Sequence, residues 1–276
     1  MHDSAKIFFE KSNNIKPDIA VILGSGLTNF FEEKDILSTI SYKDLSDFPQ
    51  PTIKGHAGKI VLGKIHNINV VCMYGRSHVY EGHDPRVLAK PIRVLKDIGC
   101  KLLIVTNAAG SLDEDMPAGS LMAITDHINL SGFNPLIGPN ADDYGPRFHD
   151  MSDGYHKNYR DQLINIANKI NQKIFQGVYC MFSGPNFETP AEIKASKILG
   201  VNAVGMSTVP EVLVANHCSL PVIAISVITN LAAGISKKKL SHQETLENAG
   251  IAEKNIISLI QKFIKEVIID DTSRNN

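Results

Sequence analysis

The sequence has only four cysteines among 276 residues, and they stand far apart at Cys72, Cys100, Cys180 and Cys218. None of them has the spacing of a zinc site, and each lies in or beside an apolar stretch. Isolated thiols of this kind behave as small buried residues and are typical of a reducing compartment. We therefore expect a cytoplasmic protein without a cysteine-bound metal.

The sequence also lacks an excess of charge of one sign and a long hydrophobic run. Its 28 Lys and Arg residues nearly balance its 29 Asp and Glu residues. The most apolar run, LPVIAISVI at 220–228, is too short to span a bilayer, and the charged N-terminal segment does not look like a signal peptide. Nucleic acid and membrane are therefore not expected as partners.

Motifs of several common catalytic sites are missing as well. H-E-x-x-H and the P-loop do not occur, and the turn Gly24-Ser25-Gly26 is followed by Asn29 where a dinucleotide fingerprint needs glycine. Ser25 also lacks the G-x-S-x-G context of a nucleophile. The turn can bring backbone N–H groups and a hydroxyl close to a phosphate, or it is simply a tight turn with a solvated serine. We expect neither a metal nor a bound cofactor.

What is present is an alternation of strand-like and helix-like segments. Short apolar or β-branched runs occupy 19–24, 59–64, 67–74, 101–106, 120–125, 177–183, 202–206 and 221–229. Helical patterns occupy 85–98, 156–171, 190–199, 209–218, 243–253 and 254–268. Several strand-like runs are apolar at nearly every residue, as strands covered on both faces are. The pattern predicts a single α/β domain over residues 1–276, with a mostly parallel or mixed central β-sheet flanked by helices.

Polar loops follow six of these runs. They begin SGL, GRSHVYEGH, NAAGS, GPNFETPAE, STVPE and NLAAG. Ligands of α/β proteins collect at the carboxyl ends of strands, so loops of this composition predict a common site. Three helices also begin with S/T-x-x-E spacing at Thr189, Thr208 and Ser241, which predicts capping boxes and favours an anion nearby. The alternative is three ordinary, well-capped helices.

The segment GRSHVYEGH at 75–83 carries the most specific signal. Arg76 presents a rigid fork of donors suited to phosphate oxygens, and His78 lies two residues on, on the same face of an extended segment. A permanent cation at this position argues against a metal site. The alternative is a solvated basic turn.

Seven ordered segments cover roughly residues 17–268: VILGSGL, GRSHVYEGH, TNAAGSL, HINLSGFNPLIGPN, GPNFETPAE, VGMSTVPEVLVANH and VITNLAAG with LSH. Together they resemble the trimeric purine nucleoside phosphorylase family, which includes inosine–guanosine, xanthosine and methylthioadenosine phosphorylases. Leu231 stands where animal members often carry lysine, so the chain resembles the bacterial type. The resemblance implies a pentosyltransferase that uses inorganic phosphate as co-substrate to release a purine base and ribose 1-phosphate.

The resemblance also implies roles for individual residues. Expected phosphate contacts are Ser25, His56, Arg76, His78, Ser207 and the backbone N–H of Ala108. Expected nucleoside contacts are Tyr80, Phe148, Phe187, Glu188, Val204, Met206, Asn230 and His242, with Phe148 reaching the site of a neighbouring subunit in a homotrimer. The expected catalytic residues are His78, Glu188, Asn230 and His242.

The base-binding residues favour 6-oxopurines. A carboxylate at Glu188 only accepts hydrogen bonds, so it favours a purine that carries N1–H, as hypoxanthine and guanine do. Asn230-Leu231-Ala232 stands where methylthioadenosine phosphorylases typically carry aspartates. Xanthosine use stays open, and so do an adenosine-type or methylthioadenosine phosphorylase, a nucleoside hydrolase and a non-catalytic purine-binding module.

Overall fold

The structure is a computed structural model that describes residues 1–46, 48–53, 55–236 and 241–267, without the side chains of His242 and Glu244. Within these residues nine strands form one mixed sheet. They are β1 (Ile19–Leu23), β2 (Ile36–Ser41), β3 (Lys59–Ile65), β4 (Ile68–Tyr74), β5 (Leu102–Ser111), β6 (Leu121–Asn129), β7 (Ile174–Met181), β8 (Ala203–Gly205) and β9 (Val222–Leu231).

The sheet has an open half and a closed half. In the open half, β4, β1, β5 and β9 run parallel side by side. Beyond β4, β3 pairs antiparallel with β4, and β2 pairs antiparallel with β3. In the closed half, β8, β7 and β6 connect β5 back to β9, which also pairs directly with β5. These five strands therefore form a closed ring, and such closure leaves no exposed edge on that side of the sheet.

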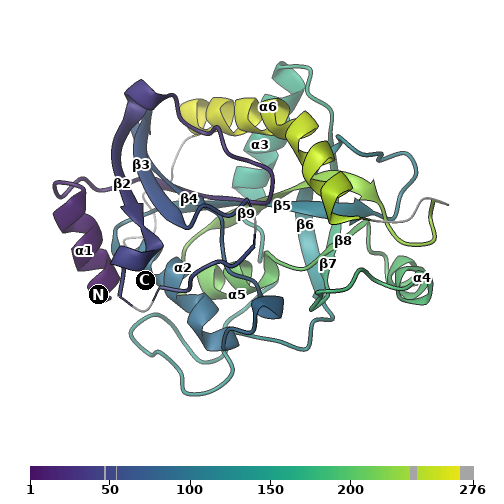
Figure 1. The fold of residues 1–276 in the computed structure, drawn as a ribbon, viewed down its shortest axis with the longest axis horizontal. Helices are drawn as coiled ribbons and strands as arrows, with labels where there is room; N and C mark the ends of the chain where they lie inside the picture. Colours follow the sequence, from purple (N-terminus) through teal and green to yellow (C-terminus); the bar gives the residue numbers. More distant parts are fainter. Residues whose placement is uncertain (47, 54, 237–240, 268–276) are drawn as a thin grey trace.

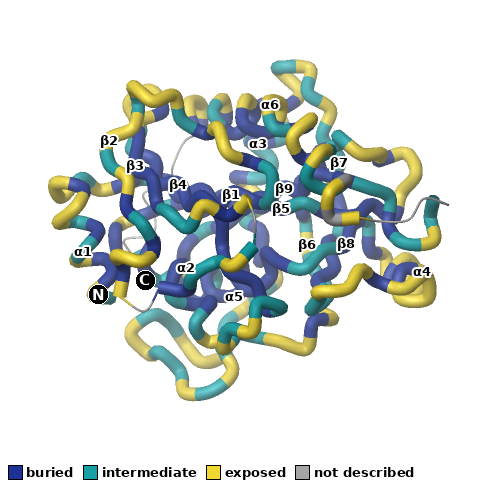
Figure 2. Tube along the Cα trace, in the orientation of Figure 1, coloured by how far each residue is buried: buried dark blue, intermediate teal, exposed yellow. Residues whose placement is uncertain are grey.

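Helices cover both faces of the sheet (Figure 1). They are α1 (Asp3–Lys11), α2 (Ala89–Asp97), α3 (Lys157–Lys169), α4 (Pro190–Ile198), α5 (Val209–His217) and α6 (His242–Glu266), with short 3-10 turns at Glu33–Asp35, Tyr42–Asp44, Val79–Glu81 and Pro85–Leu88. The pair α2 and α5 packs on one face, and the pair α3 and α6 on the other. Buried residues concentrate in the strands between these layers (Figure 2).

The helical pattern expected at 254–268 is present, and it buries an apolar stripe. Ile256, Ile260, Phe263 and Ile264 are fully buried against the sheet core. However, the two helices expected at 243–253 and 254–268 are one continuous helix, α6. It continues through Gly250 because buried residues on both sides of the glycine, Ala249 and Ala252 among them, keep one face packed.

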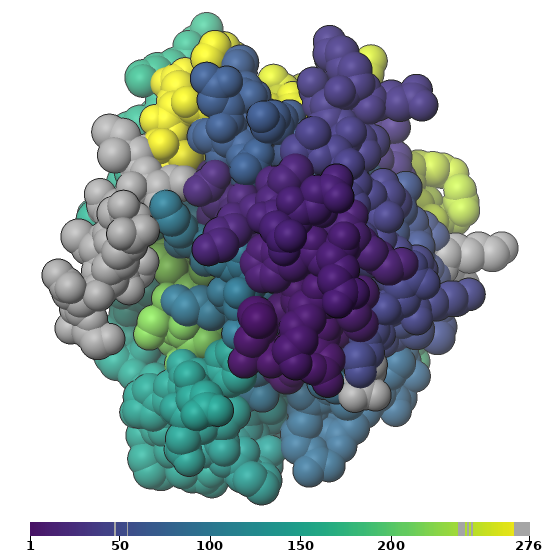
Figure 3. All heavy atoms as spheres, turned by 90° about the vertical axis from the view of Figure 1, so that its left-hand side faces the viewer, coloured from purple at the N-terminus to yellow at the C-terminus, as the bar shows by residue number. Residues whose placement is uncertain are grey.

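Every strand expected from the sequence is present, and two elements were missed. Strand β2 is largely exposed along its length, so it lacks the apolar run that marks the other strands. Helix α1 is short, and it packs on α2 and β2. Figure 3 shows the N-terminal residues, in purple, on the face that forms the left-hand side of Figure 1.

Candidate active site

One cleft of about 710 Å³ lies where the expected polar loops meet. Residues that follow or end β1, β4, β5, β7, β8 and β9 line it, so the convergence predicted from the sequence is present. The expected site residues among them are Ser25, Arg76, His78, Tyr80, Ala108, Phe187, Glu188, Val204, Met206, Ser207 and Asn230. Sequence reasoning missed other lining residues, including Thr52, Ile53, Glu81, Thr229 and Thr245.

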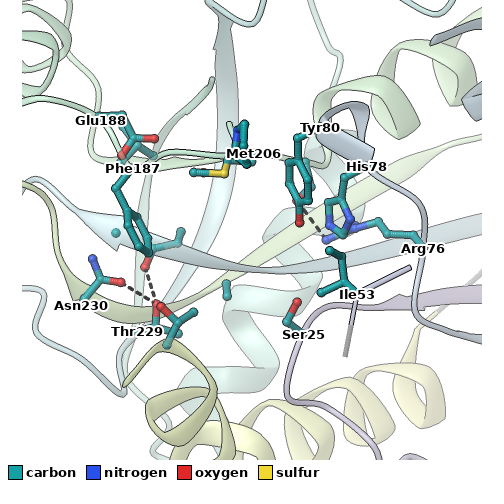
Figure 4. A pocket seen from close by; sticks show the side chains of 18 of the residues that line it. Ser25, Ile53, Arg76, His78, Tyr80, Phe187, Glu188, Met206, Thr229 and Asn230 are labelled. Atoms are coloured by element: carbon teal, nitrogen blue, oxygen red, sulfur yellow. Dashed lines mark hydrogen bonds between the residues drawn. The ribbon is translucent and has the colours of Figure 1, made fainter. Parts of the chain in front are cut away.

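The cleft has two chemically different ends (Figure 4). Arg76 and His78 lie at one end, while Phe187, Glu188 and Asn230 lie at the other. Tyr80 and Met206 lie between them, and the Tyr80 ring stacks on His78 with 4.7 Å between ring centroids. The arrangement suits an elongated ligand with an anionic group at one end and a flat polar group at the other.

Arg76 forms the centre of the cationic end. Its side chain is 5% exposed, and Nη2 donates to the Thr106 carbonyl (2.7 Å) and to Ser207 Oγ (3.1 Å). Thr106 also holds the loop that begins at Gly24, because the Thr106 hydroxyl accepts a hydrogen bond from the Gly24 N–H at 2.9 Å. Gly24 is required for this approach, because a Cβ there would lie 2.9 Å from Asn107 Cα.

His56 does not line the cleft, but it contacts two residues that do. Its Nε2 lies 2.9 Å from Ser25 Oγ, and its Nδ1 lies 2.9 Å from the backbone nitrogen of Arg76. Burial, with the nearby His78, lowers the pKa of His56 to about 4. The ring is therefore neutral near pH 7, and it orients Ser25 and Arg76 without adding charge.

Glu81 orients the His78 side chain through hydrogen bonds. His78 begins the short turn Val79–Glu81, and the Glu81 carboxylate accepts from the His78 backbone N–H (2.7 Å) and from Nδ1 (2.9 Å). Burial acts to raise the pKa of Glu81, but hydrogen bonds from His78 and Thr52 outweigh it and lower the pKa to about 2. Burial lowers the pKa of His78. Because Nδ1–H is donated to Glu81, the neutral ring presents Nε2 to the cleft as an acceptor.

Of the three helix-start predictions, one is confirmed and one is wrong, while the third, at Ser241, depends on the side chain of Glu244, which lies outside the described part of the structure. Thr189 forms the expected capping box with Glu192 at the start of α4. Thr208 does not cap α5: it has a φ of 76°, and its hydroxyl accepts from Asn107 Nδ2 at 2.8 Å. Glu211, the expected box partner, lies instead 3.5 Å from Arg76 Nη1. A non-glycine residue in this left-handed region carries strain, which is common beside ligand sites.

Glu188 at the other end is a buried carboxylate with one oxygen left unpaired among the described residues. It is 7% exposed, and its Oε1 has no hydrogen-bond partner among the residues that the structure describes. Burial raises the pKa of Glu188. A buried acceptor of this kind costs free energy unless a ligand supplies the donor.

Asn230 is held with one of its two amide hydrogens available. Its Oδ1 accepts from the Thr229 hydroxyl at 2.9 Å, and its Nδ2 donates one hydrogen to the Leu231 carbonyl at 3.1 Å, so one amide hydrogen is left for a ligand. Gly110 pairs with both Asn230 on β9 and Val204 on β8, which brings these two cleft residues to one point of the ring. A Cβ on Gly110 would lie 3.0 Å from Asn230 Nδ2, so glycine leaves room for the amide.

Besides His56, two expected site residues are placed differently, and the side chain of a third is not described. Ala108 lies inside β5, which runs on to Ser111, and not in a turn after the strand. Phe148 is 89% exposed on a surface loop, away from the cleft of its own chain. His242 begins α6, but its side chain lies outside the described part of the structure.

The described residues contain no group of three or more His, Cys, Asp or Glu side chains arranged to bind a metal ion. The four cysteines are free and buried. No helix within the described ranges has the length and apolar character needed to cross a membrane.

The family model of the phosphorylase superfamily matches residues 18–265. Purine nucleoside phosphorylase 1 of Bacillus subtilis is 44% identical over 264 residues, which cover 96% of this chain and 97% of the relative. The mouse purine nucleoside phosphorylase is 40% identical, covering 93% of this chain and 91% of the relative.

Solved structures give the same result. Schistosoma mansoni purine nucleoside phosphorylase has TM-scores of 0.90 in its complex with inosine and 0.89 in its complex with adenosine. Each is 36% identical to this protein and covers 97% of this chain and 96% of its own. With the cleft built from the family's motifs, these matches show that the chain belongs to the purine nucleoside phosphorylase family.

Proposed function

We propose that this protein catalyses the phosphorolysis of 6-oxopurine nucleosides, such as inosine and guanosine, to the free base and ribose 1-phosphate. One observation carries the proposal: the buried side chain of Arg76 and the buried carboxylate of Glu188, whose Oε1 has no hydrogen-bond partner among the described residues, lie at opposite ends of the same cleft. Phosphate fits the first end and a purine with N1–H fits the second.

At the phosphate end, Arg76, Ser25 and Ser207 supply donors, and His78 Nε2 accepts from a protonated phosphate oxygen. These groups are held by His56, Thr106 and Glu81 before any ligand arrives. Donors held in this way need no reorganisation when phosphate attacks the anomeric carbon, and a well-placed donor contributes roughly 10²–10³ in rate.

At the base end, negative charge develops on the purine as the glycosidic bond breaks. Glu188 accepts the N1–H, and the free Asn230 amide hydrogen donates to N7 or O6. Tyr80 and Met206 lie between the two ends, where the ribose would lie. The protein forms no covalent bond in this reaction, since catalysis rests on positioning and on fixed charges and dipoles.

Release of hypoxanthine from inosine, measured with and without phosphate, tests the reaction. We expect turnover only with phosphate, whereas turnover in water alone would indicate a hydrolase. Because crystals of the Schistosoma relative contain either inosine or adenosine, base preference must be tested by turnover and not by binding. We expect kcat/KM for inosine to exceed that for adenosine, since adenine leaves Glu188 unpaired; the reverse order would indicate an adenosine-type phosphorylase.

We further propose that the chain acts as one phosphorylase domain in a cytoplasmic homotrimer. The exposed ring of Phe148 supports the trimer, because an aromatic side chain left in water gains free energy by covering a neighbour's ribose. The buried free cysteines support a reducing compartment. Light scattering on the active enzyme tests the assembly, and an active monomer would contradict it.

A further inference from the structure

A second, much smaller cavity borders Arg76. Its volume is about 20 Å³, and Arg76 lines both this cavity and the main cleft. Ser77 and Glu211 also line the small cavity, together with apolar side chains such as Ile22 and Met73. Arg76 therefore lies between the proposed phosphate site and a polar corner of the core.

This corner contains buried polar atoms that make no hydrogen bond to any described residue. They are Nε and Nη1 of Arg76, Oγ of Ser77 and Oε2 of Glu211. The residues that carry them are 5%, 8% and 8% exposed, so bulk water does not solvate them. A cavity of this size has room for one water molecule, which usually has two to four polar partners, about as many as this corner offers.

Glu211 reaches Arg76 from the first turn of α5. Its Oε1 lies 3.5 Å from Arg76 Nη1, while Ser207, two residues before the helix, accepts from Nη2. One short segment therefore holds the guanidinium from two directions. Glu211 does not line the main cleft, so any effect on the substrate passes through Arg76.

We propose that Glu211 is a positioning residue for phosphate. It fixes the Arg76 guanidinium through the direct ion pair and through one water molecule that Arg76, Ser77 and Glu211 hold in the small cavity. This rests on the proposed role of Arg76 as a phosphate ligand. A carboxylate near the site also repels phosphate, so the sign of the change in phosphate affinity decides between positioning and repulsion.

Steady-state kinetics of Glu211→Gln test the proposal, because glutamine keeps the shape and removes the charge. We expect the phosphate KM to rise about tenfold, the effect of losing one charge-assisted contact, while the nucleoside KM stays the same. A folded variant with an unchanged or lower phosphate KM would overturn the proposal. Glu10→Gln, on the exposed surface of α1, is the matched control and should leave both KM values unchanged.

A double-mutant cycle separates this inference from the Arg76 assignment. Arg76→Lys alone should raise the phosphate KM, and an unchanged value would reject Arg76 as a ligand. In the Arg76→Lys background, Glu211→Gln should add little, because residues that act through one another are not additive. Fully additive effects would instead reject the positioning role.

Removal of one partner of a buried ion pair destabilises a protein, so a milder variant is needed if Glu211→Gln does not fold. Ser77→Ala removes one hydrogen-bond partner of the proposed water molecule and leaves the ion pair between Arg76 and Glu211. It should raise the phosphate KM less than Glu211→Gln does. A high-resolution crystal structure of the unmodified enzyme should show a water bonded to Ser77 Oγ and Glu211 Oε2. A dry cavity, or a phosphate KM unaffected by Ser77→Ala, would reject the water bridge.

Discussion

Replacing Glu188 with glutamine should make the protein more stable and nearly inactive. The carboxylate is 7% exposed, and its Oε1 has no partner among the described residues. Glutamine has the same size, so it leaves no cavity, and it removes a buried charge; an unsatisfied buried polar group costs about 1–3 kcal/mol, and a charged one costs more. Because the amide also needs partners, we expect a net gain of about 1 kcal/mol and a Tm higher by about 2–4 °C at pH 7.5.

The gain in stability of Glu188→Gln should depend on pH. Burial raises the pKa of Glu188 in the folded state above its unfolded value. Such a group favours the folded state at low pH, where it is protonated, and this contribution is lost as pH rises through the raised pKa. The Tm difference between Glu188→Gln and the unmodified enzyme should therefore be present at neutral pH and shrink toward pH 4.

The activity of Glu188→Gln toward inosine should fall although its stability rises. Glutamine presents an N–H₂ group or a weaker acceptor to the purine N1–H, so we expect kcat/KM for inosine to fall by about 10²–10³. Thermal unfolding and hypoxanthine release measure the two effects, with Glu10→Gln as the control for a surface carboxylate. A lower Tm at neutral pH, or full inosine turnover, would refute the assignment of Glu188 as a carboxylate kept unpaired for the base.

Other predictions address the remaining parts of the site. Asn230→Asp should shift the preference toward 6-aminopurines, because a carboxylate accepts from the amino group of adenine; an unchanged inosine-to-adenosine ratio in a folded variant would contradict the base-recognition argument. The depressed pKa of His56, about 4, contributes stability above pH 6.5 that is lost as pH falls toward 4, on the order of 3 kcal/mol. His56→Gln should therefore lose less stability than the unmodified protein between these pH values, and equal losses would argue against a neutral His56. Phe148→Ala should lower kcat/KM for inosine by roughly 10–100-fold, as expected for a lost apolar contact of about 1.5–3 kcal/mol, without changing the phosphate KM; an unchanged kcat/KM would remove Phe148 from the site.

Local sequence patterns were sufficient for much of the fold. Runs such as 101–106 and 221–229 are apolar at nearly every position, and strands buried on both faces require this composition. Strand β2 was missed because only one of its six residues is buried, and helix α1 was missed because the elements on which it packs, α2 and β2, lie farther along the chain. The pattern at Thr208 was misleading for a related reason. Its spacing fits a capping box, but the Glu211 carboxylate pairs with Arg76, which is 135 residues away in the sequence.

The sequence by itself determined that Arg76, His78, Glu188 and Asn230 follow or end strands, where ligands bind. That information is local, since it needs only the strand pattern and the chemistry of the next few residues. The tertiary structure alone decided which groups act through others, as His56 does through Ser25 and Glu211 through Arg76. It also decided that Gly110 brings Val204 and Asn230 together. These contacts join segments that meet only when the ring of strands closes, and no local pattern specifies that closure.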